Sequence, residues 1–473
     1  MRSTPELHIG SPRRFLRRPR MTCTRESGDR PIRMDRHRFA SQPSRRHVSP
    51  TIAVTAARAR LTRGNFMQAA QRYQHVLTQH LAKPLEHAVS LPALFYTDPG
   101  IFAHELAVLD ERHWRVAAAS GQVGRPGDVL PVTLSGMPLV VTRDRDGTLG
   151  CFHNICKHRG VPLVSEMASD VNSIRCPYHA WRYGLNGSLE RASHFNGIHD
   201  HRVDESRRAC LELDRVRSAC WNGLICVNPG GRAAPLADTL AALDTRWHDY
   251  DFSQLHYGGA LHYRVHGNWK LVVENFLDSY HNPFVHPALN KASLWNEHYQ
   301  VVDDHFCGVG TYVYDAATAG HGGLPTFAGL SPQRARGAEY LLASPTLMLG
   351  LHADYLFVLT VDPVDVQTTD EHVYFFFVGE PSGDASDPLE AIRMRVRANW
   401  DRINREDIPM IEGMQACRRS PGYRPGPFSP FHEGPLHAFQ LSLARRMAPE
   451  PDVPASCAVR HDAFRFHPIS VEA

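Results

Sequence analysis

The chain has 473 residues, of which 42% are hydrophobic and 21% are charged, and its formal net charge is +3 at pH 7. It is long enough for two or three domains. No uninterrupted apolar run approaches the ~18–20 residues of a membrane span, and the ten cysteines are too scattered for a disulfide framework. We therefore expect a reducing, cytoplasmic location and no membrane partner.

Residues 1–63 differ from the rest of the chain in charge. They hold 16 Arg, no Lys and four acidic residues, a balance of +12. Pro and Ser are frequent and apolar periodicity is weak, which predicts a basic, disordered extension over 1–66. The same composition also fits an Arg-rich organelle transit peptide, or an over-long reading frame whose true start is Met67. Nothing else in the chain indicates nucleic-acid binding.

Residues 67–115 are predicted to form a helical lead-in, with helical stretches over 67–89 and 101–114 separated by Pro99-Gly100. From Gly124 the pattern changes to short β-rich runs divided by turns such as Asp146-Gly147. This pattern predicts a small all-β domain over 116–234, which ends at a linker of sequence PGGRAAP (229–235).

Residues 235–473 are predicted to form a second domain of α+β type. A helix is expected over 268–281, and β-like runs follow at 346–352, 355–363 and 372–381. A long helix is then expected from Asp387 to Arg418, because Asp387 before Pro388 is typical of a helix start. Pro409 is expected to interrupt this helix. The segment 316–338, rich in Gly, Ala and Pro, is expected to be a loop.

Two short loops in the β-rich domain each carry one cysteine and one histidine. They contain Cys156 and His158, and Cys176 and His179. Two thiolates and two imidazoles are the ligands of a Rieske [2Fe–2S] centre. A structural zinc site also uses Cys2His2, but zinc fingers usually group Cys with Cys and His with His. Cys210, Cys220 and Cys226 are expected to be buried thiols rather than ligands.

A second group of candidate metal ligands lies in the sequence NWKLVVENFLDSYHNPFVHP (268–287). On a helix, Asp278 and His281 share one face. Pro283 would end that helix and let His286 return toward the same point. Two imidazoles completed by one carboxylate are typical of a non-haem Fe(II) site.

The candidate ligands lie in three motifs, CKHRG (156–160), CPYHAWRYGLNGSL (176–189) and E-N-x-x-D-x-Y-H-x4-H. With these motifs the chain resembles the alpha subunit of Rieske-type, ring-hydroxylating non-haem iron oxygenases, over roughly residues 90–440. The resemblance implies a Rieske domain followed by a helix-grip catalytic domain, an antiparallel sheet with a long C-terminal helix. It makes Asp407 the carboxylate ligand that joins His281 and His286, with Glu406, Asp401 and Glu412 as the competing acids. Asn275 matches an asparagine near the iron. Asp278 matches an acid that bridges His281 and His179 of the neighbouring subunit in a homotrimer.

The resemblance also implies the reaction. An NAD(P)H-dependent reductase, directly or through a ferredoxin, supplies electrons that pass from the [2Fe–2S] cluster to the mononuclear Fe(II), where O2 oxidises a small organic substrate. Three features favour a resemblance to the oxygenases of quaternary ammonium compounds, and hence N-demethylation. They are the E-N-x-x-D spacing, Pro287 after His286, and the short segment between His286 and Asp407. Those enzymes often have Glu where this chain has Asp278, so aromatic-ring dioxygenation stays the alternative. A pure Rieske electron carrier and a zinc-organised binding protein are the other classes considered.

Overall fold

The computed structural model describes residues 63–382 and 386–449, and all of them belong to one compact unit. The predictions for residues 1–62 concern a segment outside the described residues. Among the described helices, none is long and apolar enough to cross a membrane.

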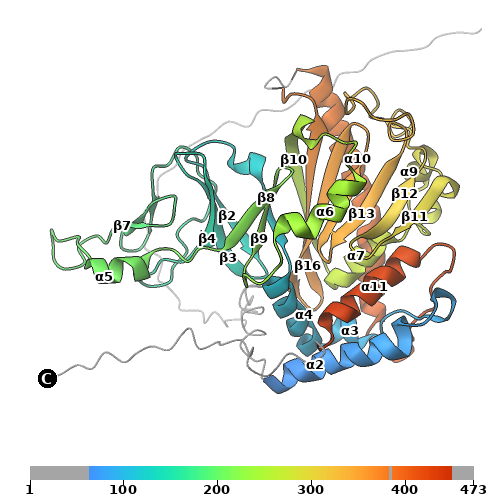
Figure 1. Cartoon of the computed structure of the whole chain (residues 1–473), viewed down its shortest axis with the longest axis horizontal. Helices are drawn as coiled ribbons and strands as arrows, with labels where there is room; N and C mark the ends of the chain where they lie inside the picture. Colours follow the sequence, from blue (N-terminus) through green and yellow to red (C-terminus); the bar gives the residue numbers. More distant parts are fainter. Residues whose placement is uncertain (1–62, 383–385, 450–473) are drawn as a thin grey trace, which may run out of the picture. The chain divides into compact units, whose positions relative to one another are not determined.

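A seven-stranded antiparallel sheet forms the centre of the C-terminal half (Figure 1). Its strands, in spatial order, are β10 (Leu255–Val265), β16 (Thr368–Val378), β15 (Tyr355–Asp365), β14 (Leu347–Leu351), β13 (Ala338–Ser344), β12 (Cys307–Thr311) and β11 (His298–Val302). The three predicted β-like runs become β14, β15 and β16, and the predicted loop ends where β13 begins.

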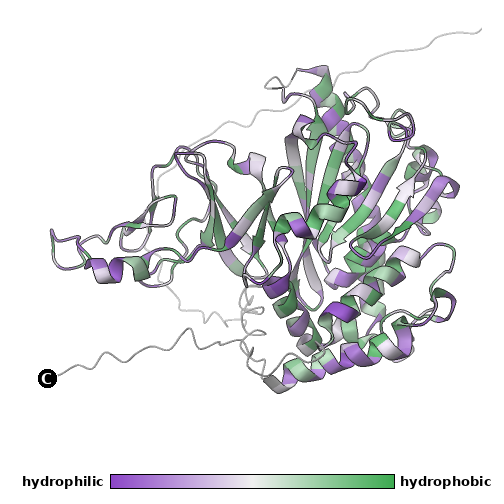
Figure 2. Ribbon diagram, viewed as in Figure 1, coloured by the Kyte–Doolittle hydropathy of each residue, from purple (hydrophilic) through white to green (hydrophobic). Residues whose placement is uncertain are grey.

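Both faces of this sheet are covered, and apolar residues are concentrated along its strands (Figure 2). On β16, Val373, Phe375 and Phe377 face a helical layer. Tyr374 and Phe376 point to the opposite face, where they pack with residues of the β-rich region. Burial on two faces explains why this strand forms a continuous apolar run rather than an alternating one.

The helical layer is formed by segments from both ends and from the middle of the described chain. It contains α2 (Arg63–Val76), α3 (Leu94–Thr97), α4 (Pro99–Arg112), α7 (Trp269–Leu277), α8 (Asn282–Val285), α9 (Pro287–Ala292), α10 (Pro388–Cys417) and α11 (Gly434–Met447). The sheet with α10 across it is the predicted helix-grip arrangement, whereas α11 had no sequence prediction. Pro99-Gly100 begins α4 rather than breaking a helix, because Asp98 accepts hydrogen bonds from the first free N–H groups.

The β-rich region consists of three small antiparallel sheets. They are formed by β1 (Arg115–Ala119), β9 (Leu224–Asn228) and β8 (Arg217–Trp221), by β2 (Val129–Leu134), β3 (Met137–Arg143) and β4 (Leu149–His153), and by β5 (Ile174–Arg175), β6 (Arg182–Tyr183) and β7 (Leu189–Arg191). Two further helices are α5 (Glu205–Arg208) and α6 (Leu236–Arg246). The eight cysteines within the described ranges are free thiols, but Cys210 and Cys220 are exposed, so the prediction that they are buried was wrong.

Three predicted boundaries differ in the structure. Helix α2 begins at Arg63, within the predicted 1–66 extension, and Phe66 packs edge-on against the His104 ring at 5.4 Å between centroids. Helix α7 ends at Leu277 instead of residue 281, where Asp278 adopts extended backbone, and Pro283 lies in the first turn of α8. By contrast, α10 runs through Pro409, which was expected to interrupt it. The other predicted domain limits stay predictions.

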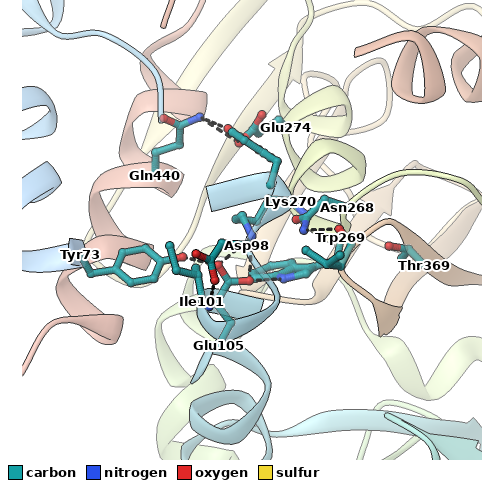
Figure 3. Close-up of polar contacts among 12 residues, drawn as sticks. Tyr73, Asp98, Ile101, Glu105, Asn268, Trp269, Lys270, Glu274, Thr369 and Gln440 are labelled. Atoms are coloured by element: carbon teal, nitrogen blue, oxygen red, sulfur yellow. Dashed lines mark hydrogen bonds and ion pairs between the residues drawn. The ribbon is translucent and has the colours of Figure 1, made fainter. Parts of the chain in front are cut away.

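Helix α7 is anchored by a buried polar network, shown in Figure 3. The Lys270 ammonium donates to both carboxylate oxygens of Glu105 at 2.8 and 2.7 Å, and both side chains are fully buried. The Trp269 indole N–H and the Tyr73 hydroxyl donate to the same carboxylate. Because Glu105 lies on α4 and Tyr73 on α2, the lead-in helices hold the helix that precedes Asp278 and His281.

We expect Glu105→Gln to lower the free energy of unfolding by about 3 kcal/mol, because it leaves the Lys270 charge buried without a counter-ion. Chemical denaturation of the purified variant measures this loss. The matched control is Asp214→Asn, which breaks the Lys157–Asp214 pair, in which the Asp214 side chain is 64% exposed. This change should cost no more than about 1 kcal/mol. Equal losses in the two variants would contradict the role given to the buried pair.

Candidate metal centres

The two Cys/His loops have the same backbone construction. Cys156 N–H donates to the Val161 carbonyl at 2.9 Å, and Cys176 N–H donates to the Trp181 carbonyl at 2.7 Å. In each loop the fourth residue after the cysteine, Gly160 or Ala180, has a positive φ of 72° or 57°. This left-handed residue turns the chain back tightly, which brings the cysteine and histidine of each loop to one end of the domain.

The four predicted cluster ligands converge in the structure. Cys156 and Cys176 are buried, and His158 Nδ1 lies 3.1 Å from His179 Nδ1. Two imidazole nitrogens that face each other at this separation suit coordination to one iron, and the two thiols suit the other iron. The donor set therefore fits a Rieske [2Fe–2S] cluster.

Aromatic side chains support these loops. The Trp181 ring stacks on the His158 imidazole, with 4.9 Å between centroids and 5° between planes. The Tyr183 hydroxyl lies 3.5 Å from Cys156 Sγ and accepts a hydrogen bond from Lys157 N–H at 3.1 Å. Tyr183, on β6, had no sequence signal beyond its place in the second motif.

His281, His286 and Asp407 form the second cluster, and their ligand atoms lie within 4.8 Å of one another. Asp407 Oδ1 is 2.9 Å from His286 Nε2 and 3.4 Å from His281 Nε2. The two histidines flank α8 and Asp407 lies on α10, so residues 121 positions apart meet. The donor set is the predicted two-histidine, one-carboxylate arrangement for non-haem iron.

The electrostatics of this cluster also fit a bound cation. Burial lowers the pKa of His281, but Asp278 and Asp407 outweigh burial and raise it to about 9. Burial raises the pKa of Asp407, yet the two imidazoles hold it below its ordinary value. Without metal, a proton on His281 supplies positive charge at this point, and a metal ion would replace it.

Two further carboxylates orient the histidines from their other nitrogens. Asp278 Oδ2 is 3.3 Å from His281 Nδ1, although the two residues lie in the turn after α7 and not on the predicted common helix face. Glu406 Oε2 is 2.7 Å from His286 Nδ1. Such carboxylates fix the ring orientation and raise the basicity of metal-binding histidines. Glu406 appeared in the sequence only as a competitor for the ligand position.

The remaining candidates have separate roles. Asn275 Nδ2 donates to Asp407 Oδ1 at 3.2 Å, which places it beside the cluster as predicted. Glu274 points elsewhere and accepts hydrogen bonds from Tyr96 and Gln440 (Figure 3). Asp401 accepts from Tyr263 and Arg405, and Glu412 accepts from the His266 N–H.

A cavity adjoins the His281–His286–Asp407 cluster, and the centres of water-sized molecules can occupy about 110 Å³ of it. It lies between the helical layer and the floor formed by β10, β15 and β16. Space for a small ligand therefore lies directly beside the three metal-binding side chains.

Comparisons with known proteins agree with this geometry. The family described as "Rieske [2Fe-2S] domain" matches residues 113–201, and "Ring hydroxylating alpha subunit (catalytic domain)" matches residues 252–449. The chain belongs to the Rieske non-haem iron oxygenase alpha-subunit family. It is an oxidoreductase of that family, whose members carry a [2Fe–2S] cluster and a mononuclear iron and receive electrons from NAD(P)H through a reductase.

Individual relatives are distant but cover most of this oxygenase. The chloroplastic choline monooxygenase of Atriplex hortensis is 27% identical over 368 residues, 76% of this chain and 78% of the relative. The glycine betaine monooxygenase oxygenase subunit of Pseudomonas aeruginosa is 27% identical over 390 residues, 75% of this chain and 88% of the relative. A solved structure of a quaternary ammonium Rieske monooxygenase that oxidises carnitine matches with a TM-score of 0.65 at 21% identity, covering 78% of this chain and 98% of that one.

Proposed function

We propose that this oxygenase hydroxylates a small quaternary ammonium compound, and that attack on an N-methyl carbon releases formaldehyde. One observation carries the proposal: the cavity beside the metal-binding side chains is lined by the rings of Tyr340, Phe357 and Trp400. The Phe357 and Trp400 centroids are 4.2 Å apart, and Tyr340 is 6.1 Å from Trp400. Aromatic faces attract quaternary ammonium groups through the ring quadrupole.

The two groups of side chains are the proposed cofactor ligands. The [2Fe–2S] cluster would be held by Cys156, His158, Cys176 and His179, and Fe(II) would be held by His281, His286 and Asp407. The mononuclear iron supplies O2 activation when it is bound. The protein holds the histidines through Asp278 and Glu406 and places the substrate in the adjoining cavity.

The substrate class is tested by O2 uptake with the purified oxygenase and a compatible reductase. Choline-type and betaine-type compounds should give substrate-dependent uptake, and formaldehyde should appear when an N-methyl carbon is attacked, because the hydroxylated product is an unstable hemiaminal. Simple aromatic acids should give no uptake. Uptake with aromatics alone, with a diol product and no formaldehyde, would favour the ring-dioxygenating alternative.

We further propose a homotrimer in which the cluster of one chain faces the mononuclear site of the next. His179 is exposed, and Tyr178 beside it is 62% exposed. Near the other site Phe284 is 77% exposed and lies between the two histidine ligands in sequence. Exposed apolar side chains beside both centres are typical of a contact surface. Asp278 would then accept N–H bonds from His281 and from the neighbour's exposed histidine.

We expect Asp278→Asn to retain both metal centres but to slow reoxidation of the reduced cluster by about 10–100-fold, because the carboxamide keeps the size and loses the charge that orients the imidazoles. Stopped-flow absorbance of the cluster in a single turnover measures the rate. Asp401→Asn is the control, because it removes a nearby charge that faces Arg405 instead. A normal rate in Asp278→Asn would show that Asp278 only supports the fold.

A further inference from the structure

A buried glutamate in the cavity has no role in the metal centres described above. Glu371 lies on β16, between Tyr263 of β10 and Val361 of β15, and its side chain lines the cavity. Its relative exposure is 0%, and neither carboxylate oxygen has a partner at full hydrogen-bond geometry among the described residues. A buried carboxyl that faces a cavity without a well-aligned partner has hydrogen-bonding capacity free for a ligand.

The strand register explains why Glu371 points into the cavity. Side chains alternate between the two faces of a strand, so Glu371 lies on the same face as Val373 and Phe375, which face the helical layer. Asn404 of α10 also lines the cavity, and its Nδ2 likewise lacks a well-aligned partner within the described ranges. The Glu371 carboxyl and the Asn404 amide, which interact with each other, therefore lie in the same cavity as the aromatic rings.

The charged lining of the cavity consists of acidic residues and of His281, whose proton a metal ion would replace. Its acidic lining residues are Asp278, Glu371 and Asp407, and no Lys or Arg is found among its described lining residues. Asp278 and Asp407 are engaged with His281 and His286, which leaves Glu371 without an ion-pair partner in the described structure. Burial raises the pKa of Glu371 to about 8, the nearby Asn404 amide opposes the rise, and the charge of Asp407 adds to it. A cation bound beside Glu371 would favour the ionised form.

We propose that Glu371 is the anionic partner of the substrate's ammonium group, and that the cavity selects a monocation without a carboxylate over a zwitterion. This inference deepens the proposed function and rests on it. The rings of Tyr340, Phe357 and Trp400 would surround the methyl groups, while Glu371 supplies the counter-charge. A substrate carboxylate close to Glu371 would meet no Lys or Arg side chain among the described lining residues and would lie beside a like charge, which disfavours betaine-type ligands there.

Calorimetric binding to the iron-loaded protein tests the proposal without turnover. The probes are choline, its neutral isostere 3,3-dimethylbutan-1-ol, and glycine betaine. The wild-type protein should bind choline at least about tenfold more tightly than either other probe. Glu371→Gln should weaken choline binding by about tenfold or more and leave the isostere within about twofold, whereas Glu371→Asp should recover part of the choline affinity. Glu412→Gln, which removes an acid outside the cavity lining, should change neither.

Several outcomes would overturn the proposal. Equal weakening of choline and the isostere in Glu371→Gln would indicate a packing role, and loss of iron from that variant would indicate a role at the metal. Tighter binding of glycine betaine than of choline by the wild-type protein would overturn the selection for a monocation. Failure of the proposed function is seen separately, as the absence of O2 uptake with every trimethylammonium compound.

Discussion

Replacing Asp407 by alanine is expected to remove the mononuclear iron and to lower substrate-dependent O2 uptake by at least about a thousandfold. Asp407 Oδ1 is the carboxylate atom that reaches the Nε2 atoms of both histidines, at 2.9 and 3.4 Å. Two imidazoles alone are an incomplete set for this type of site. The ligands of the [2Fe–2S] cluster lie on other loops, so the EPR signal of the reduced [2Fe–2S] cluster should persist. Iron and acid-labile sulfide analysis, with EPR, measures both centres in one preparation.

Glu406→Gln is the matched control, because Glu406 is adjacent in sequence and contacts the same histidine through its other nitrogen. The glutamine oxygen still accepts from His286 Nδ1–H, so this variant should retain iron with an affinity reduced by about 10–100-fold. If the Asp407 variant kept one mononuclear iron per chain while the Glu406 variant lost it, Glu406 would be the iron ligand and Asp407 the acid that orients the histidine.

Replacing Cys156 by serine, or His179 by alanine, is expected to abolish the [2Fe–2S] cluster and to lower turnover at least about a thousandfold, because each residue is one of only four ligands. The red-brown colour and the EPR signal of the reduced protein should disappear. Mononuclear iron should remain near one per chain, because its three side chains come from a different part of the fold. Wild-type protein should contain two irons and two acid-labile sulfides in the cluster.

Cys210→Ser is the control for the thiol change. Cys210 is an exposed free thiol in the same β-rich region, and it lines a surface pocket with His158 and Trp181. Its removal should leave colour, EPR and turnover unchanged. A colourless wild-type protein that contains zinc would instead support the Cys2His2 zinc alternative.

Much of this arrangement was predictable because it depends on local spacing. Each Cys/His pair lies within four residues, so one tight loop presents both ligands, and the structure adds the matching left-handed residues Gly160 and Ala180. Helix α10 was predicted almost to the residue, because Asp387 and Pro388 are a local start signal and the Asp387 side chain does accept from the Leu389 N–H at 2.9 Å.

Other features were mispredicted because neighbouring residues carry conflicting signals. Helix α7 was expected to reach residue 281, but Asp278 adopts extended backbone and Pro283 begins the separate helix α8. Asp278 still reaches His281, through a turn rather than along a helix face. Pro409 was expected to interrupt α10, but the helix continues through it. The packing of this 30-residue helix outweighs one missing hydrogen bond.

The sequence by itself determined the identity of the two metal centres, since ligand type and spacing are encoded within two short segments and the family resemblance follows from them. It also indicated the order of the domains and the principal strands. Only the tertiary structure decided which acid of α10 meets the histidines, that Glu406 supports His286 from behind, and that Glu274 serves the buried network. It alone placed Glu371 in the cavity without an ion-pair partner among the described residues. The physical reason is distance along the chain: these contacts join residues more than 100 positions apart, and a carboxylate acquires its role from the groups that surround it after folding.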